Sequence, residues 1–451
     1  MIPISTTHNP AAGQVPQAGL FRRAGTPLLL LALGACNDSS NWSPDVYGLS
    51  AESRRMLEEA DVPAHEAVQL EGLLTELFGT PRKPAYALLD DPTMVAELTG
   101  GMDALDEAGR RLLMDENELR FEGLLEFVDA GELNAMVISP SYPELWRRWD
   151  AFMAETGGVD TQVNIERAEA LILADYPTLE ETARKFQALC LHCHGSSGAG
   201  DGPTAEFLSP RPRNYHHGVF KRVSVERNTR PLRADLREIL LNGIRGTAMP
   251  SFARLSRSGL EGLVDYVRFL SLRGETERML VASALVGEAL DLAKARELRQ
   301  LAWRRWHGAP KHLVQPTVAA LQESTVESIA RGRELYASSA GGNCASCHGA
   351  GGRGDGPSAF ELDEAGELQP ALWDEWGRSL QARDLTEGLY RFGGEPLDLY
   401  RRIRTGISGG PMPGVGSGAG MPGDQNTGSG APLSEGDIWD LVHFVRSLGE
   451  G

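Results

Sequence analysis

The chain of 451 residues has no apolar run approaching the roughly 18–20 residues that a transmembrane helix needs. A polytopic membrane protein is therefore excluded. Basic side chains are also in deficit, with 44 Lys and Arg against 62 Asp and Glu, for a net charge of −18. Nucleic-acid binding needs an excess of cations, so that class is excluded too. Cysteine is scarce, with only five residues. What remains is ordinary soluble composition, and the length predicts two or three domains.

The first cysteine follows a pattern typical of export. Arg22 and Arg23 precede a leucine-rich run, which ends in the small residues before Cys36. A positive region, a short apolar region and a small-residue site indicate a signal peptide over 1–35. The stretch resembles a bacterial lipoprotein signal, which implies cleavage before Cys36 and a lipid on its sulfur. An ordinary secretory signal and a buried amino-terminal helix are the alternatives.

The other four cysteines fall in two copies of one motif, Cys-x-x-Cys-His. The first copy places Cys190 and Cys193 before His194, and the second places Cys344 and Cys347 before His348. This is the attachment signature of c-type haem. Two intervening residues let both sulfurs reach the vinyl groups of one porphyrin, and the following histidine then lies under the iron. Two such motifs in one exported chain predict two covalently bound haem c groups.

Three other sites use cysteine pairs and compete with this interpretation. A zinc site would need further Cys or His at finger-like spacing, and none follows either motif. A thioredoxin-like pair would follow a strand, whereas helical patterns over 179–189 and 329–337 precede these motifs. Structural disulfides are the third alternative. The duplication of the whole motif favours haem over all three.

The repeat extends beyond the motif and reaches a candidate sixth iron ligand. Residues 194–205 match residues 348–359 at eight of twelve positions, and Gly-Ile-x-Gly-x-x-Met-Pro occurs at 243–250 and again at 406–413. Met249 and Met412 are therefore equivalent, and a thioether ligand raises the haem potential. Met421, in a second Met-Pro-Gly sequence nearby, remains an alternative to Met412. His216 and His217 offer a bis-histidine alternative at the first haem, but surface positions are expected for them.

These motifs give residues 176–275 and 328–451 a resemblance to class I cytochrome c domains, similar to the tandem domains of the di-haem subunit of high-affinity haem–copper oxidases. The resemblance implies small helical folds around each haem. It also implies that carbonyls of Pro203 and Pro357 accept from Nδ1 of the ligand histidines. Arg213 and Arg383 are candidates for contact with haem propionates, with solvated arginines as the alternative. The chain lacks the oxidase subunit's transmembrane helix, so membership of that enzyme does not follow.

The expected fold is mainly α, with two class I cytochrome c-like domains and an N-terminal helical extension. The extension, residues 36–175, is acidic and without haem, and residues 276–327 form a helical linker that contains one long helix over 277–302. The extension carries 29 acidic and 10 basic side chains, a balance of −19. Residues 176–275 carry 10 and 15, a balance of +5. The extension is expected either to fold back on this basic domain or to face a partner protein.

The function expected from these features is electron relay at the periplasmic face of a bacterial membrane. The protein would be a lipid-anchored carrier rather than an enzyme, with His/Met ligation at both irons and redox proteins as donor and acceptor. The alternatives are a di-haem peroxidase-like enzyme or a haem subunit with an open sixth position, and a haem-based gas sensor.

Overall fold

The computed structural model describes residues 45–85, 154–155, 177–317, 323–391, 393–416 and 432–449. This part of the chain is mainly α-helical, which confirms the predicted fold class. The signal-type segment with Cys36, the alternative ligand Met421 and most of the acidic extension after residue 85 lie outside the described residues.

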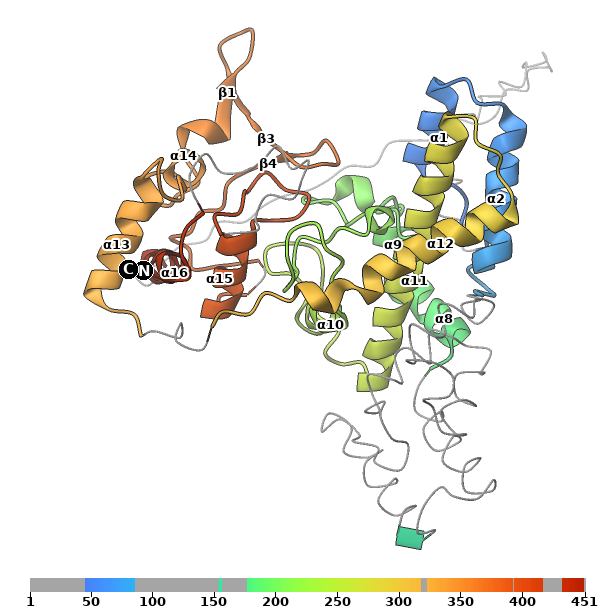
Figure 1. Ribbon diagram of the computed structural model, residues 1–451, viewed down its shortest axis with the longest axis horizontal. Coiled ribbons are helices and arrows are strands. Elements are labelled where there is room, and N and C mark those ends of the chain that lie inside the picture. Colours follow the sequence, from blue (N-terminus) through green and yellow to red (C-terminus); the bar gives the residue numbers. More distant parts are fainter. Residues whose placement is uncertain are drawn as a thin grey trace, which may run out of the picture. The chain divides into compact units, whose positions relative to one another are not determined.

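The part of the chain around the first Cys-x-x-Cys-His motif is called here the first cytochrome region. Helix α11 (Arg257–Leu285) is its central element (Figure 1). Its apolar side chains Leu263, Val264 and Leu270 are buried. Several other helices pack against it or complete its surroundings: α8 (Leu179–Leu189), α9 (Leu191–His194), η4 (Ala205–Phe207), η5 (Tyr215–His217), α10 (Arg233–Asn242), α12 (Leu292–His307) and η6 (Ala309–His312).

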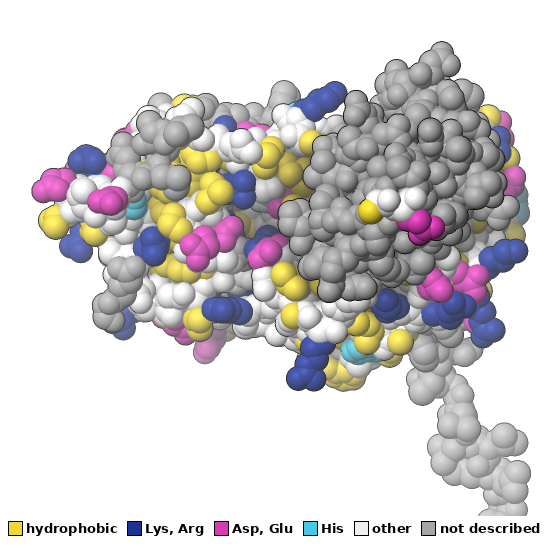
Figure 2. Space-filling view, turned by 90° about the horizontal axis from the view of Figure 1, so that it is seen from below, with side chains coloured by type: hydrophobic (Ala, Val, Ile, Leu, Met, Phe, Trp, Pro, Cys, Tyr) yellow, Lys and Arg dark blue, Asp and Glu magenta, His cyan; other side chains and the backbone are white. Residues whose placement is uncertain are grey.

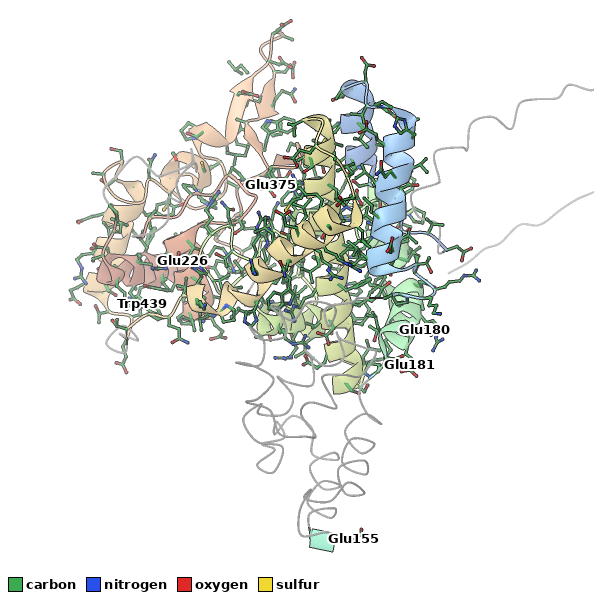
Figure 3. The ribbon with its side chains drawn as sticks, turned by 45° about the vertical axis from the view of Figure 1, so that its right-hand side comes forward. Glu155, Glu180, Glu181, Glu226, Glu375 and Trp439 are labelled. Carbon is green, nitrogen blue, oxygen red and sulfur yellow. The ribbon has the colours of Figure 1, made fainter. Side chains whose placement is uncertain are left out.

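Helix α8 leads directly into the first Cys-x-x-Cys-His motif, and its start is set by a capping box. The amide of Glu181 donates to the hydroxyl of Thr178 at 3.1 Å, and the Glu181 carboxylate accepts from the Thr178 amide at 2.8 Å. These two bonds satisfy N–H groups that the first helical turn leaves unpaired. Figure 3 shows Glu180 and Glu181 together at this end of α8. The helix matches the pattern predicted over 179–189 and delivers Cys190 at its C-terminal end.

The described part of the acidic extension folds onto the first cytochrome region. Helices α1 (Ala51–Glu59) and α2 (Ala64–Phe78) both contact α11, and their apolar faces join the same core. Leu70, Leu74 and Phe78 are almost completely buried there. The ring of Phe78 meets Phe269 edge to face, with 5.7 Å between centroids. Residues 45–85 are therefore an integral part of this core.

The second cytochrome region is built on two crossing helices, α13 (Val326–Ala337) and α16 (Glu435–Leu448). Gly332 permits their close approach, because a Cβ at this position would lie 2.6 Å from the carbonyl carbon of Asp440. Trp439 is buried on α16 and stacks on Tyr400, with centroids 4.8 Å apart. The remaining elements are α14 (Ala345–His348), η8 (Pro357–Ala359) and α15 (Pro396–Thr405).

Two short β-hairpins interrupt the helices of the second region, and the sequence analysis did not predict them. Strand β1 (Phe360–Leu362) pairs with β2 (Leu368–Pro370), and β3 (Leu372–Trp373) pairs with β4 (Ser379–Leu380), both antiparallel. The single helix predicted over 277–302 is also wrong. Helix α11 runs through residue 276 to Leu285, and α12 begins only at Leu292, where the Asp291 side chain caps it. The boundary drawn at 275/276 thus falls within α11.

Within the described ranges, no helix combines the length and apolar character needed to cross a bilayer. The face of the molecule shown in Figure 2 carries cationic and anionic side chains intermingled. On this face the described residues present no patch of a single charge.

Candidate haem sites

In the first Cys-x-x-Cys-His motif, Leu191–His194 form the single turn of α9, and Cys190 is the one residue that separates this turn from α8. Cys190 is buried, and burial raises the pKa of its thiol to about 12. His194 is also buried, and its ring stacks on Tyr215 with 4.9 Å between centroids. Gly195 ends the turn with a φ of 75°, a conformation that favours glycine.

His194 is oriented as an iron ligand should be. Burial lowers its pKa to about 4, so the imidazole is neutral near pH 7. Its Nδ1 lies 3.3 Å from the carbonyl oxygen of Arg213, which can only accept a hydrogen bond. The proton therefore belongs on Nδ1, which leaves the Nε2 lone pair free for a metal.

Met249 and the motif residues line one cavity of about 600 Å³. The methionine lies in the turn that follows α10, and its amide donates to the Thr247 hydroxyl at 3.1 Å. Cys190, Cys193 and His194 enter the same cavity from α8 and α9. The structure thus brings together all four residues proposed for the first haem.

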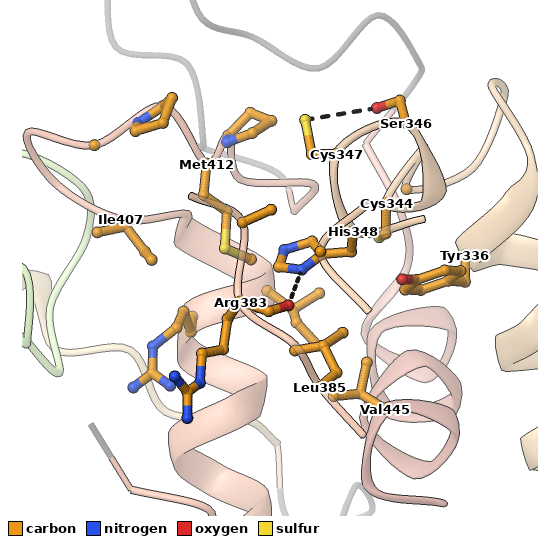
Figure 4. A pocket seen from close by; sticks show the side chains of 18 of the residues that line it. Tyr336, Cys344, Ser346, Cys347, His348, Arg383, Leu385, Ile407, Met412 and Val445 are labelled. Atoms are coloured by element: carbon orange, nitrogen blue, oxygen red, sulfur yellow. Dashed lines mark hydrogen bonds between the residues drawn. The ribbon is translucent and has the colours of Figure 1, made fainter. Parts of the chain in front are cut away.

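The second motif repeats this arrangement in a cavity of about 900 Å³. Cys344, Cys347 and His348 line it together with Met412, and Figure 4 shows the methionine sulfur and the histidine ring facing each other. Burial raises the pKa of the Cys344 thiol to about 12 and lowers the pKa of His348. Nδ1 of His348 lies 2.9 Å from the carbonyl oxygen of Arg383.

The carbonyls that face the histidine rings belong to Arg213 and Arg383, so the expectation for Pro203 and Pro357 was wrong. Each proline closely follows its motif, whereas the accepting carbonyl comes from a later point in the chain, 19 residues after His194 and 35 after His348. The repeated Gly-Asp-Gly-Pro sequence therefore shapes the turn without supplying the acceptor.

The residues present fit a haem group in each cavity. A volume of several hundred Å³ with mostly apolar lining and a few convergent polar groups is typical of a cofactor site. Each cavity offers the two thiols and the imidazole of its motif and one thioether, and His192 also lines the first cavity. All four motif cysteines are free thiols rather than disulfides. Among the described residues, no three His, Cys, Asp or Glu side chains gather as a metal site.

The two cavities adjoin, and cationic side chains lie between and around them. Lys221, Leu380 and Arg391 line both cavities. Burial lowers the pKa of Lys221 and of Arg391, and it lowers the pKa of Arg402, beside the second cavity, to about 10. Buried cations of this kind would suit the carboxylates of haem propionates.

The two arginines predicted for propionate contact differ in their surroundings. Arg213 lies over the ring of Trp376, with its guanidinium carbon 3.9 Å from the ring centroid, and burial lowers its pKa to about 10. It also lines the first cavity. Arg383 is partly exposed and donates to the carboxylate of Glu387 at 2.7 Å. Sequence reasoning missed Lys221, Arg391 and Arg402, because they lie outside the repeated motifs and reach the cavities through tertiary packing.

Neither His216 nor His217 lines either cavity. His216 is completely buried, contrary to the expected surface position. Its Nε2 lies 3.0 Å from the Ser197 carbonyl oxygen, and its Nδ1 lies 3.7 Å from the Glu277 carboxylate. His217 faces Glu52 of α1, with 3.0 Å between Nε2 and the carboxylate. Both histidines therefore tie the motif loop and the extension to α11, which disfavours a bis-histidine haem.

Both repeated regions match families of known proteins. Residues 329–449 match the cytochrome c family, and residues 177–267 match the family of cytochrome c oxidase, cbb3-type, subunit III. Each of the two repeated regions is therefore similar to a cytochrome c family, which confirms the predicted resemblance.

Among solved structures, the chain is similar to one from the reducing HAO-like protein complex of Kuenenia stuttgartiensis. That chain is 24% identical over 60% of this chain and 96% of its own length, with a TM-score of 0.43. A search of curated proteins found no significant match.

Proposed function

We propose that the protein is a di-haem c-type cytochrome that relays electrons between redox partners, with His/Met ligation at both irons. One observation carries this proposal. In each of two adjoining cavities, the motif histidine and the repeated methionine line a common space together with both motif cysteines. A haem bound there would supply reversible one-electron chemistry at iron.

Each residue in the donor sets has a distinct role. Cys190 and Cys193 would attach the first haem by thioether bonds, and His194 and Met249 would bind its iron. Cys344 and Cys347 would attach the second, with His348 and Met412 as ligands. The Arg213 and Arg383 carbonyls hold the imidazoles in one orientation and raise their basicity. A thioether opposite histidine favours a relatively high potential and a six-coordinate iron, which suits transfer rather than substrate binding.

The location and partners are proposed from the sequence. Residues 1–35 act as an export signal, and a lipid on Cys36 holds the mature protein at the periplasmic face of a membrane. The donor and acceptor are redox proteins that approach the haem edges. We propose the division into 36–175, 176–275, 276–327 and 328–451 as the domain organisation, with the boundary at 275/276 moved to the end of α11 at Leu285.

Carbon monoxide binding separates electron relay from the peroxidase-like alternative, because that alternative requires an exchangeable sixth position. The exported protein with both haems attached should show the Met–iron charge-transfer band when oxidised, and it should bind carbon monoxide only slowly when reduced. Rapid binding at either iron, together with loss of that band, would reject the relay.

Single substitutions test which methionine ligates the second haem. Met412→Ala should open the second iron to carbon monoxide, while Met421→Ala should leave binding and spectrum unchanged. The reverse result would assign the ligand to Met421 and leave the class of protein intact.

A further inference from the structure

The turns that carry Met249 and Met412 have the same backbone frame. In the first turn, the Ile244 amide donates to the Met249 carbonyl at 3.1 Å. In the second, the Ile407 amide donates to the Met412 carbonyl, also at 3.1 Å. The two methionines are therefore presented alike, and any difference between the turns comes from the surrounding side chains.

The first turn is braced from within by Thr247. Its hydroxyl donates to the Ile244 carbonyl at 2.8 Å and accepts from the Met249 amide at 3.1 Å. The equivalent position in the second turn is Gly410, which has no side chain to form these bonds. The second copy of the repeat thus lacks the internal brace of the first.

Arg227, from the first cytochrome domain, braces the second turn instead. Its Nη1 donates to the Met412 carbonyl at 2.6 Å, and its Nη2 donates to the Gly410 carbonyl at 2.9 Å. Only 6% of this side chain is exposed. Gly406 leaves room for the guanidinium, because a Cβ at this position would lie 2.5 Å from Nη1.

Neighbouring contacts fix Arg227 relative to the turn. The Asn228 amide donates to the hydroxyl of Ser408 at 3.0 Å. On the other side, Nη1 of Arg404 donates to the carboxylate of Glu226 at 2.6 Å, and Glu226 is labelled in Figure 3. Arg227 is thus the central one of three consecutive residues, 226–228, that each contact the second domain.

From this geometry we infer that Arg227 is a positioning residue for the sixth ligand of the second haem. This inference rests on the proposed function, in which Met412 binds that iron. A planar guanidinium that donates to two carbonyls fixes their relative position, which a lysine ammonium cannot reproduce. Losing one hydrogen bond from a charged donor should weaken the turn about tenfold or more. The first domain therefore holds the ligand of its neighbour's haem in place.

The test uses the exported full-length protein with both haems attached. A Met249→His background removes the Met–iron band of the first haem, so the remaining band reports Met412 alone. In that background, Arg227→Gln should lose most of the band, and carbon monoxide should bind the second iron at least about tenfold faster. Arg227→Lys keeps the positive charge but cannot donate to both carbonyls in the same geometry. Its band intensity and its rate of carbon monoxide binding should therefore lie between those of Arg227→Gln and those of the parent.

Glu226→Gln is the matched control, since it removes a neighbouring contact between the domains and leaves both carbonyls of the turn bonded. It should keep the band. The inference is overturned if Arg227→Gln keeps the band and the slow carbon monoxide binding, if Arg227→Lys equals the parent, or if Glu226→Gln equals Arg227→Gln.

Two further measurements complete the test. Met412→His must abolish the remaining band, and if the band persists, the ligand assignment has failed rather than the role of Arg227. If Arg227→Gln does not accumulate as folded protein, amide hydrogen exchange over 407–412 is measured in Arg227→Lys instead. This measurement then decides whether Arg227 holds the turn of Met412 in place. Faster exchange than in the parent supports the brace, and unchanged exchange overturns it.

Discussion

At the residue scale, the haem-attachment turns depend on glycines that lie against the backbone. Gly356 packs on the turn of α14, where a Cβ would come within 2.6 Å of both the Ala345 carbonyl oxygen and the Cys347 carbonyl carbon. Gly202 has the equivalent contacts in the first motif. Because the obstacles are backbone atoms, they cannot turn aside as a flexible side chain would.

Gly356→Ala should therefore displace the second motif and leave the first intact. Overpacking of this kind costs about 1–3 kcal/mol, and the displaced thiols should receive haem less completely. Denaturant unfolding and the haem-to-protein ratio measure the two effects. Gly351→Ala is the control, since a Cβ there would approach nothing closer than the Arg353 side chain at 4.0 Å. Equal behaviour of the two variants would contradict the steric argument.

Residues that act within one short motif were predictable from the sequence. Residues that reach the site only through tertiary packing were not. The spacing of the cysteines and histidines is itself the chemistry of attachment, so the donor sets could be read from the sequence. The accepting carbonyls were misassigned to Pro203 and Pro357, because the carbonyls of Arg213 and Arg383 reach the rings through tertiary packing. Arg227 has no sequence signal of its own, although the replacement of Thr247 by Gly410 in the repeat marks a missing brace.

At the element scale, α11 connects the cytochrome fold to the extension through a buried carboxylate. Glu277 is completely buried and accepts hydrogen bonds from the Ser50 amide at 2.8 Å and the Ser53 hydroxyl at 2.7 Å. Arg273 donates to the same carboxylate at 2.8 Å. Burial alone would raise the pKa of Glu277, but His216, Arg273 and the hydrogen bonds from Ser53 and Ser50 together lower it to about 2.

A carboxyl group whose pKa is lowered by folding stabilises the native state above its ordinary pKa of 4.5. That stability is lost as the pH falls from about 4.5 toward 2. Glu277→Gln should lower the free energy of unfolding at pH 7 by about 3 kcal/mol, because Arg273 stays buried without its carboxylate. The difference from wild type should shrink with acidification, as denaturant unfolding at several pH values would show. Glu288→Gln, at an exposed carboxylate beyond the same helix, should change stability much less.

Helices with a regular apolar pattern were predicted from the sequence, whereas the two short β-hairpins were not. Helices α8 and α13 cover the helical patterns predicted over 179–189 and 329–337. The pattern across α11 and α12 does not show the break between them, because both helices keep an apolar face toward the same core. The hairpins are too short for a period, but each has an Asp-x-x-Gly turn, at 363–366 and 374–377, that could have indicated them.

At the scale of the whole molecule, the acidic extension is partly explained. The expectation that it folds back on the basic domain holds for its described part, residues 45–85, whose helices share the core of the first domain. That contact is mainly apolar, with the buried Glu277 of α11 bonded to Ser50 and Ser53 within it and the contact of His217 with Glu52 at its margin. The described part of the extension is therefore held by apolar packing and by a carboxylate of α11 rather than by its own excess of acidic side chains.

One positive charge, that of Lys221, should influence the potentials of both haems. Lys221 lies 3.1 Å from the Asp374 carboxylate of the second domain, is largely buried and lines both cavities. A cation near iron disfavours the ferric state and so raises the potential, and burial limits its screening by salt. Lys221→Gln should therefore lower both midpoint potentials, by on the order of tens of millivolts. Redox titration of the protein with both haems attached measures this. Lys311→Gln, at an exposed lysine, should change neither potential. A shift confined to one haem would show that Lys221 acts on a single site, and would contradict the shared charge that the adjoining cavities imply.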